Sequence, residues 1–269
     1  MIFYVSSLGQ SNDLHNKKCS IVPQYAYAHH ITKEYATAVK NYLRVFDVLK
    51  GKSDIDKEFF VHDYCLSNFS YDHKFGIHSF SVLGPVLNKA AVCEGIAKFV
   101  KIAFDHIGVK SLVVSGIANN PAQGSAMEAH AWNIVKIGGK TYHLDVTFDM
   151  TLTNKVKRYD YFNLSDHDIK KDHVIINDVP SCTTMGHDFY SLNSLSVSSS
   201  AELNDYIGKA LKQSKKNILV KIMNLQYSAS ATKKIMEIAQ RQYGMIYKGD
   251  VMVEIGYNPS QMVFEINFK

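Results

Sequence analysis

The stretch that decides the fold reads Val92-Cys93-Glu94-Gly95-Ile96-Ala97. From Cys93 onward, apolar residues recur every three or four positions, and charged residues occupy positions between them. The apolar set is Ile96, Phe99, Val100, Ala103 and Ile107, and the charged set is Glu94, Lys98, Lys101 and Asp105. This spacing predicts an amphipathic helix that begins at or next to Cys93, and Gly108 is a suitable residue to end it.

A cysteine at the start of a helix is placed where it can react. The first turn carries backbone N–H groups without helical partners and the positive end of the helix dipole, and both favour a thiolate. The alternative is a structural role, because a cysteine on an amphipathic helix usually serves as a small buried apolar residue. A histidine base and a carboxylate near Cys93 would favour the reactive interpretation.

A second informative stretch is a predicted hairpin around Gly138-Gly139. Runs of strand-forming residues flank this two-residue turn signal, which sets the pairing of Ile137 with Lys140. Continued along both strands, the register places Trp132 opposite Asp145 and His130 opposite Thr147. One face then carries His130, Trp132, His143, Asp145 and Thr147, and the other carries Ala131, Val135, Ile137, Tyr142, Leu144, Val146 and Phe148.

This register makes His130 and Asp145 diagonal neighbours on one face, roughly 7–8 Å apart along the backbone and within side-chain reach. Cysteine, histidine and aspartate are the parts of a thiol nucleophile, its base and the group that orients the base. His143 is the rival base and Asp149 the rival orienting group, but the register places both further from the His130 pair. We therefore predict Cys93, His130 and Asp145 as the catalytic residues.

The same residues carry a family resemblance. Three blocks agree in order and context: Cys-Glu-Gly-x-Ala at 93–97, His-Ala-Trp-Asn at 130–133 and His-Leu-Asp-Val-Thr-Phe-Asp at 143–149. Flanking blocks at 62–64, 68–72 and 161–165 extend the similarity over roughly residues 30 to 170. The chain resembles the transglutaminase-like (papain-like cysteine) superfamily of bacterial proteins. The resemblance implies an α+β fold in which the cysteine helix packs against an antiparallel sheet.

The resemblance also implies an activity, namely cysteine-dependent acyl transfer on a peptide or carboxamide, as in a protease, an amidase or a transglutaminase. The alternative is a non-catalytic cell-surface or interaction module that retains the fold. Three departures from the family pattern, Leu83, Ile96 and Phe148, leave the oxyanion-stabilising group and the cleft lining open. Candidates for the lining of the substrate cleft are Ser81, Glu94, Trp132 and His143. Trp132 could equally serve as an anchor of the sheet.

Composition limits the partners. The formal net charge of +5 comes from dispersed lysines and arginines, which argues against nucleic acid. A protein or peptide substrate follows from the resemblance, with cell-wall peptide as one candidate, and the oligomeric state stays open. We expect no cofactor and no metal, because no Cys/His spacing fits a zinc site. The cysteines are Cys19, Cys65, Cys93 and Cys182, which we expect as free thiols, with a disulfide between two of the others still open.

The sequence contains no apolar run long enough to span a membrane, and residues 1–5 are too short for a signal peptide. Relatives of this kind are often exported or surface-attached, so a secreted, surface or cytoplasmic location stays open.

We expect three parts: an N-terminal arm over 1–30, a transglutaminase-like catalytic core with N-terminal helices over 31–195, and a small C-terminal unit over 196–269. The arm has two possible short strands, at 2–5 and 21–27. The predicted elements of the core are helices over 32–49 and from Ser53 through Tyr64, a strand over 111–115, a loop over 116–129 and a short helix capped by Ser165. A Ser-rich link precedes the C-terminal unit, whose pattern is αβαββ.

Overall fold

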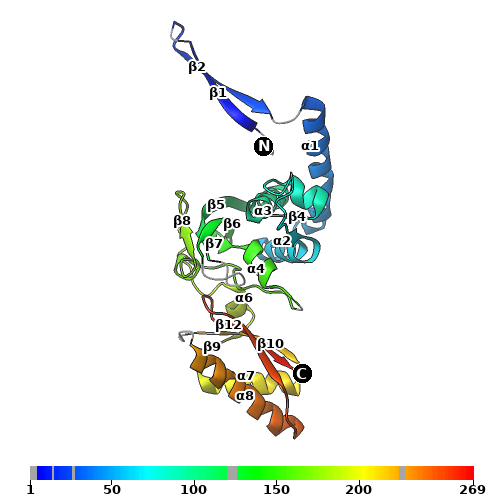
Figure 1. The fold of residues 1–269 in the computed structure, drawn as a ribbon, viewed down its shortest axis with the longest axis vertical. Helices are drawn as coiled ribbons and strands as arrows, with labels where there is room; N and C mark the ends of the chain where they lie inside the picture. Colours follow the sequence, from blue (N-terminus) through cyan, green and yellow to red (C-terminus); the bar gives the residue numbers. More distant parts are fainter. Residues whose placement is uncertain (1–4, 14, 26–27, 120–125, 155, 224–227) are drawn as a thin grey trace. The chain divides into compact units, whose positions relative to one another are not determined.

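The computed structural model describes residues 5–13, 15–25, 28–119, 126–154, 156–223 and 228–269 (Figure 1). The chain divides into two compact units, Met1–Val109 and Lys110–Lys269. The first is mainly helical and the second holds two antiparallel or mixed sheets, so the predicted α+β class is confirmed. No helix in the described part of the chain is long and apolar enough to cross a membrane. The predicted boundaries at 30/31 and 195/196 stay predictions.

The first unit begins with a hairpin and continues with helices. Its elements before the cysteine helix are β1 (Val5–Asp13), β2 (Lys18–Tyr25), α1 (His29–Leu43), the 3₁₀ helix η1 (Arg44–Leu49) and α2 (Asp54–Asn68). Strands β1 and β2 pair antiparallel, so the arm is more regular than predicted. Residues 2–4 and 26–27 of the expected strands lie outside the described residues. Ser53 caps α2 as expected, because its side chain accepts a hydrogen bond from the Asp56 N–H.

The predicted helix over 32–49 is wrong in its last third, where the α-helix gives way to η1. In a 3₁₀ helix, residues three apart lie one above the other. The 3₁₀ geometry therefore places Phe46 and Leu49, which are three apart, on one buried side. Phe46 packs there against Phe99 of the cysteine helix, with ring centroids 6.2 Å apart.

The cysteine helix α3 (Cys93–Ile107) has the predicted bounds. Gly108 follows it with φ +79°, the left-handed conformation that ends many helices. All five apolar residues of the predicted face are buried: Ile96, Phe99, Val100, Ala103 and Ile107. The short elements before α3 are β3 (Ser70–Tyr71), the π-helical turn η2 (Gly84–Asn88) and β4 (Ala90–Ala91), with β3 and β4 parallel.

Gly95 explains why the start of α3 fits against the loop before η2. A Cβ atom at this position would lie 2.3 Å from the carbonyl oxygen of Ser79, closer than any side chain tolerates. The Val92 N–H also donates to that Ser79 oxygen, at 3.1 Å. The glycine two residues after the cysteine is thus required by the close approach of helix and loop.

The second unit opens with an antiparallel sheet in the order β7-β6-β5-β8. Its strands are β5 (Lys110–Ala118), β6 (Glu128–Ile137), β7 (Lys140–Leu144) and β8 (His173–Ile175). The predicted hairpin register is confirmed, since Ile137 pairs with Lys140 and Ile134 with His143. The predicted loop over 116–129 is wrong at both ends, because β5 continues through Ala118 and β6 begins at Glu128; its central residues 120–125 lie outside the described residues.

The register does not continue past Leu144, which corrects the predicted pairs of Trp132 with Asp145 and of His130 with Thr147. The chain turns into helix α4 (Val146–Leu152), and the Asp145 carboxylate accepts hydrogen bonds from the N–H groups of Thr147 and Phe148. Aspartate is among the residues most favoured at this capping position. The cap therefore ends the strand although apolar residues continue to alternate beyond it.

The remaining elements of the second unit are helices and the strands of a second sheet. They are α5 (Asp166–Ile169), α6 (Phe189–Leu192), β9 (Ser196–Val197), α7 (Ser200–Lys212), β10 (Asn217–Ile222), α8 (Ala229–Tyr247), β11 (Val253–Asn258) and β12 (Val263–Phe268). Ser165 caps α5 as expected. The sheet order is β11-β12-β10-β9, so the predicted αβαββ pattern is present and gains β9, which runs parallel to β10. Its core is separate and includes Leu203, Ile207, Val220, Ile238, Phe264 and Ile266.

Buried polar bonds join this C-terminal sheet to the residues that precede it. Arg158 and Asp160 form a two-bond ion pair of 3.0 and 2.7 Å, and the Asn258 side chain donates to the same aspartate at 3.1 Å. Lys221 of β10 lies 3.2 Å from Asp188, and both are nearly inaccessible to solvent. Such pairs fix the geometry of the junction, because breaking a buried pair costs several kcal/mol, about 3–5.

Candidate active site

His130 and Asp145 meet in the second unit. Nε2 of His130, on β6, lies 2.6 Å from Oδ2 of Asp145, which is fully buried. The other carboxylate oxygen, Oδ1, accepts the N–H groups of Thr147 and Phe148, each at 3.0 Å. The His130 ring lies 4.5 Å from the Phe148 ring and stacks on Trp132 at 5.9 Å, centroid to centroid. Asp145 caps α4 and ends the strand earlier than predicted. The same cap therefore also orients the Asp145 carboxylate toward His130.

Cys93 is the first residue of α3, in the first unit, and is partly exposed. The residue before it, Val92, has no side-chain oxygen and gives the helix no side-chain cap. Most helices satisfy one of their first N–H groups with a Ser, Thr, Asp or Asn at this position. An apolar residue there leaves the helix terminus electropositive around the cysteine.

His173 is a member of this group that sequence reasoning missed. Its Nε2 lies 3.1 Å from Oδ2 of Asp145, and its Nδ1 lies 2.6 Å from Oδ1 of Asp172. The Tyr161 hydroxyl donates to Oδ2 of Asp172 at 2.6 Å. The only signal in the sequence is the adjacent pair Asp172-His173, and no spacing rule links it to Asp145, twenty-eight residues earlier.

The electrostatics of the group follow from these contacts. Burial alone would raise the pKa of Asp145, but the charge of a protonated His130 and hydrogen bonds from His130 and His173 hold that pKa well below its usual range. Burial lowers the pKa of His173, but the hydrogen bonds and charges of Asp145 and Asp172 outweigh burial and raise it. The geometry therefore favours an ionised Asp145 and a protonated His173.

Two of the predicted cleft residues form a separate buried pair. The indole Nε1–H of Trp132 donates to Nδ1 of His143 at 3.0 Å, and Nε2 of His143 donates to Oδ1 of Asp166 at 2.9 Å. Both side chains are inaccessible to solvent, so Trp132 anchors the sheet. His143, the rival base, has both ring nitrogens engaged in these bonds. The rival orienting group, Asp149, is buried in α4 and accepts the Tyr161 N–H at 3.0 Å.

The other two predicted cleft residues lie in the first unit. Glu94, in the first turn of α3, pairs with Lys98 one turn further along. The Ser81 hydroxyl donates to the His78 carbonyl at 3.0 Å and accepts the Leu83 N–H at 3.2 Å. These contacts are local, and the place of Glu94 and Ser81 in the substrate cleft stays a prediction.

Among the residues that the structure describes, two clusters place potential metal ligands within 4.8 Å of one another: His130, Asp145 and His173, and His143, Asp166 and Cys182. Their nitrogen–oxygen separations of 2.6–3.1 Å are those of hydrogen bonds. A metal would need an unprotonated nitrogen facing each carboxylate, yet His173 faces a carboxylate from both nitrogens. His143 already accepts a hydrogen bond from the Trp132 N–H on its other nitrogen. The donor chemistry of both clusters thus fits hydrogen bonding better than metal ligation.

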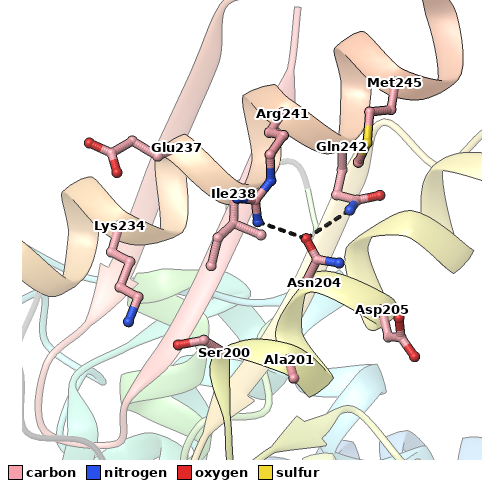
Figure 2. A pocket seen from close by; sticks show the side chains of 10 residues that line it. All are labelled: Ser200, Ala201, Asn204, Asp205, Lys234, Glu237, Ile238, Arg241, Gln242 and Met245. Atoms are coloured by element: carbon pink, nitrogen blue, oxygen red, sulfur yellow. Dashed lines mark hydrogen bonds between the residues drawn. The ribbon is translucent and has the colours of Figure 1, made fainter.

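Two surface hollows belong to the second unit. One, of about 460 Å³, borders His173 and is lined by Asp166, Lys170, Ile175, Asn177 and Pro180, among others. The other, of about 580 Å³, lies between α7 and α8, where Asn204 accepts hydrogen bonds from Arg241 at 3.0 Å and Gln242 at 2.7 Å (Figure 2). Its lining mixes acidic and basic side chains and contains no histidine or cysteine. Of these two hollows, the one beside His173 adjoins the candidate active-site residues.

Comparison with known proteins finds one family model and two solved structures that are similar to parts of this chain. The family model of the Transglutaminase-like superfamily matches residues 28–146, a range that includes Cys93, His130 and Asp145. A solved structure described as a "Putative Cysteine Protease from Cytophaga hutchinsonii" is similar at 18% identity, covering 40% of this chain and 37% of that one, with a TM-score of 0.35. A second, described as "a TGase", is similar at 19% identity, covering 49% and 36%, with a TM-score of 0.39.

This chain thus spans little more than a third of either solved structure. The comparison with curated proteins gives no significant match. The family match covers the first two sequence blocks, the start of the third block and the two residues of the His130–Asp145 contact. Residues 28–146, less than half of the chain, are similar to the transglutaminase-like superfamily.

Proposed function

We propose that the protein catalyses cysteine-dependent acyl transfer on a peptide or carboxamide, with Cys93 as nucleophile, His130 as base and Asp145 as the orienting group. The observation that carries the proposal is the 2.6 Å contact between His130 Nε2 and the buried Asp145 carboxylate. The position of Cys93 at an uncapped helix start and the family match over 28–146 support it. Members of this superfamily are often cysteine-dependent enzymes.

The contact assigns the two nitrogens of His130 different tasks. An ionised carboxylate only accepts hydrogen bonds, so Nε2 carries the proton of the hydrogen bond to Asp145. In the neutral ring Nδ1 is then the basic nitrogen, and it takes the proton of the Cys93 thiol. Asp145 fixes this tautomer and stabilises the imidazolium that forms.

The reaction then proceeds in two steps. The Cys93 sulfur attacks the substrate carbonyl, and the C–N bond breaks as the imidazolium of His130 gives its proton to the leaving amine. A thioester on Cys93 remains. Water or a second amine, deprotonated by His130, attacks the thioester and restores the thiol, giving hydrolysis or transamidation. A protein or peptide is the substrate class that we propose, with cell-wall peptide as one candidate.

Thiol labelling tests the proposal. The reagent is iodoacetamide at neutral pH, applied in a Cys19→Ser background because Cys19 is exposed while Cys65 and Cys182 are buried. Peptide mapping should find Cys93 alkylated rapidly. His130→Ala should slow the alkylation of Cys93 about tenfold, because only a few per cent of a thiol without a base is ionised near pH 7.

A matched control is His106→Gln, which removes a histidine–aspartate pair with Asp47 from the far end of the same helix. This variant should react at the parent rate. Equal rates in the parent and His130→Ala would contradict the proposal and would favour the non-catalytic interaction module.

A further inference from the structure

His173 lies between two buried carboxylates. It is 1% exposed, Asp145 is 0% exposed and Asp172 is 5% exposed. Each of its ring nitrogens faces one carboxylate oxygen, at 3.1 Å for Asp145 and 2.6 Å for Asp172. Because an ionised carboxylate can only accept, both nitrogens must carry protons for both contacts to be hydrogen bonds. The arrangement requires an imidazolium, which also offsets part of the negative charge of the two aspartates.

The packing around the ring leaves it little freedom. Its centroid lies 4.9 Å from that of Trp132, 4.8 Å from Phe148 and 5.6 Å from Tyr161. Backbone packing fixes the strand that carries it, since a Cβ at Gly116 of β5 would lie 2.2 Å from the Val174 carbonyl of β8. The ring is therefore held by aromatic contacts and by a strand that only glycine allows to pack so closely.

The titratable groups that face His173 come from each neighbouring element. They are His130 on β6, His143 on β7, Asp145 before α4, Tyr161 and the adjacent Asp172. Among these named groups, Asp145 and Asp172 are the two carboxylates. The Tyr161 hydroxyl donates a hydrogen bond to Asp172, which leaves Asp172 an acceptor toward His173. The two carboxylates thus favour a protonated His173.

We infer that His173 is a positioning residue for the proposed reaction: a buried cation that keeps Asp145 ionised and turned toward His130. Both imidazoles donate to the same carboxylate oxygen, Oδ2. His173 thereby holds Oδ2 of Asp145 in place. The backbone N–H groups of α4 hold Oδ1 of the same carboxylate in the same way. The inference rests on the proposed function, because its consequence for Cys93 is transmitted through His130.

The experiment uses His173→Gln and the milder Asp172→Asn, with His106→Gln as control. The first readout is the ¹⁵N spectrum of the histidine rings across pH, which requires no activity. We expect both nitrogens of His173 to be protonated at pH 7 in the parent. In Asp172→Asn, the His173 ring should lose a proton at a lower pH than in the parent. In both variants, the ¹⁵N spectrum of His130 should show a proton that is less fully localised on Nε2.

The second readout is the rate of Cys93 alkylation by iodoacetamide against pH. His173→Gln should slow it about ten- to a hundredfold at neutral pH, the equivalent of one hydrogen bond to a charged group. Asp172→Asn should approach the parent rate at low pH, where His173 is protonated, and fall below it as pH rises. A purely structural role would lower the rate equally at every pH.

The two readouts separate the possible failures. A neutral His173 at pH 7 in the parent, or a His130 ring spectrum unchanged in both variants, overturns the inference whatever Cys93 does. An unreactive Cys93 in a parent whose His173 is doubly protonated overturns the proposed function, while the His130 spectrum still decides the positioning role. Asp172→Asn keeps the test available if His173→Gln does not fold.

Discussion

Two buried histidines of the second unit, His143 and His173, respond in opposite ways to similar surroundings. Both are inaccessible to solvent and both contact a carboxylate. Burial lowers the pKa of His143, and Asp166 offsets only part of that effect. For His173, the two aspartates outweigh burial and raise the pKa. Burial alone therefore does not determine the charge of a histidine in this site.

The second partner of each ring accounts for the difference. Nδ1 of His143 accepts a hydrogen bond from the indole N–H of Trp132, so this nitrogen has no place for a proton of its own. His173 faces Asp172 with the corresponding nitrogen. The carboxylates also differ, because the Asp166 side chain is 25% exposed and screened by water, whereas that of Asp145 is 0% exposed. One pair is a neutral anchor of the sheet, and the other is a charged support for the proposed catalytic aspartate.

Replacing each histidine should give the largest difference between the two, measured as the free energy of unfolding. His173→Gln leaves Asp145 and Asp172 buried without their shared cation, so it should lower the free energy of unfolding by about 3–5 kcal/mol at pH 7. His143→Gln removes a neutral hydrogen-bonded group and should cost about 1–3 kcal/mol. Urea unfolding followed by the fluorescence of Trp132, the only tryptophan, reports on this unit. Equal losses in the two variants would mean that the two rings carry the same charge.

The pH dependence of stability should separate the two rings by sign. The folded-state pKa of His143 lies below the free value of about 6.5, so its contribution is complete above that pH and is lost as pH falls. The folded-state pKa of His173 lies above 6.5, so its contribution is complete below that pH and is lost as pH rises through the folded value.

Urea unfolding between pH 5 and 9, a range well above the ordinary aspartate pKa of about 3.9, measures both contributions. His143→Gln should flatten the rise in stability up to about pH 6.5, and His173→Gln should flatten the decline above it. If the two variants gave parallel curves of stability against pH, the opposite directions assigned to the two pKa shifts would be contradicted.

The smallest expected effect comes from Trp132→Phe, which converts His143 toward the situation of His173. Loss of the indole N–H frees Nδ1 of His143 to take a proton, and the resulting imidazolium can pair with Asp166. The pKa of His143 should therefore rise, with a stability change of about 1 kcal/mol for the lost hydrogen bond. Titration of the His143 ring by NMR tests this, and an unchanged or lower pKa would show that the indole does not keep the ring neutral.

Local sequence signals predicted much of this structure. Gly138-Gly139 determined the register that places Trp132 beside His143, and the apolar spacing after Cys93 located α3. The prediction failed at Asp145, because a helix cap ends the strand that the alternating apolar residues predicted to continue.

The role of His173 could not be predicted for a different reason. Its contacts with Asp145 depend on the pairing of β8 with β5, which joins segments far apart in the chain. A dipeptide such as Asp172-His173 carries no information about such a pairing. Tertiary packing, rather than local propensity, therefore decides the charge of this ring.

The most direct test of the account is whether Cys93 accepts an acyl group with the help of His130. The probe is p-nitrophenyl acetate at neutral pH, added to the Cys19→Ser background with and without His130→Ala or Asp145→Asn. The account predicts a rapid burst of nitrophenolate near one equivalent per chain, with the acetyl group on the Cys93 peptide, slowed most by His130→Ala and less by Asp145→Asn, which acts indirectly. A burst of the same rate in all three proteins, or one that persists in Cys93→Ala, would contradict it.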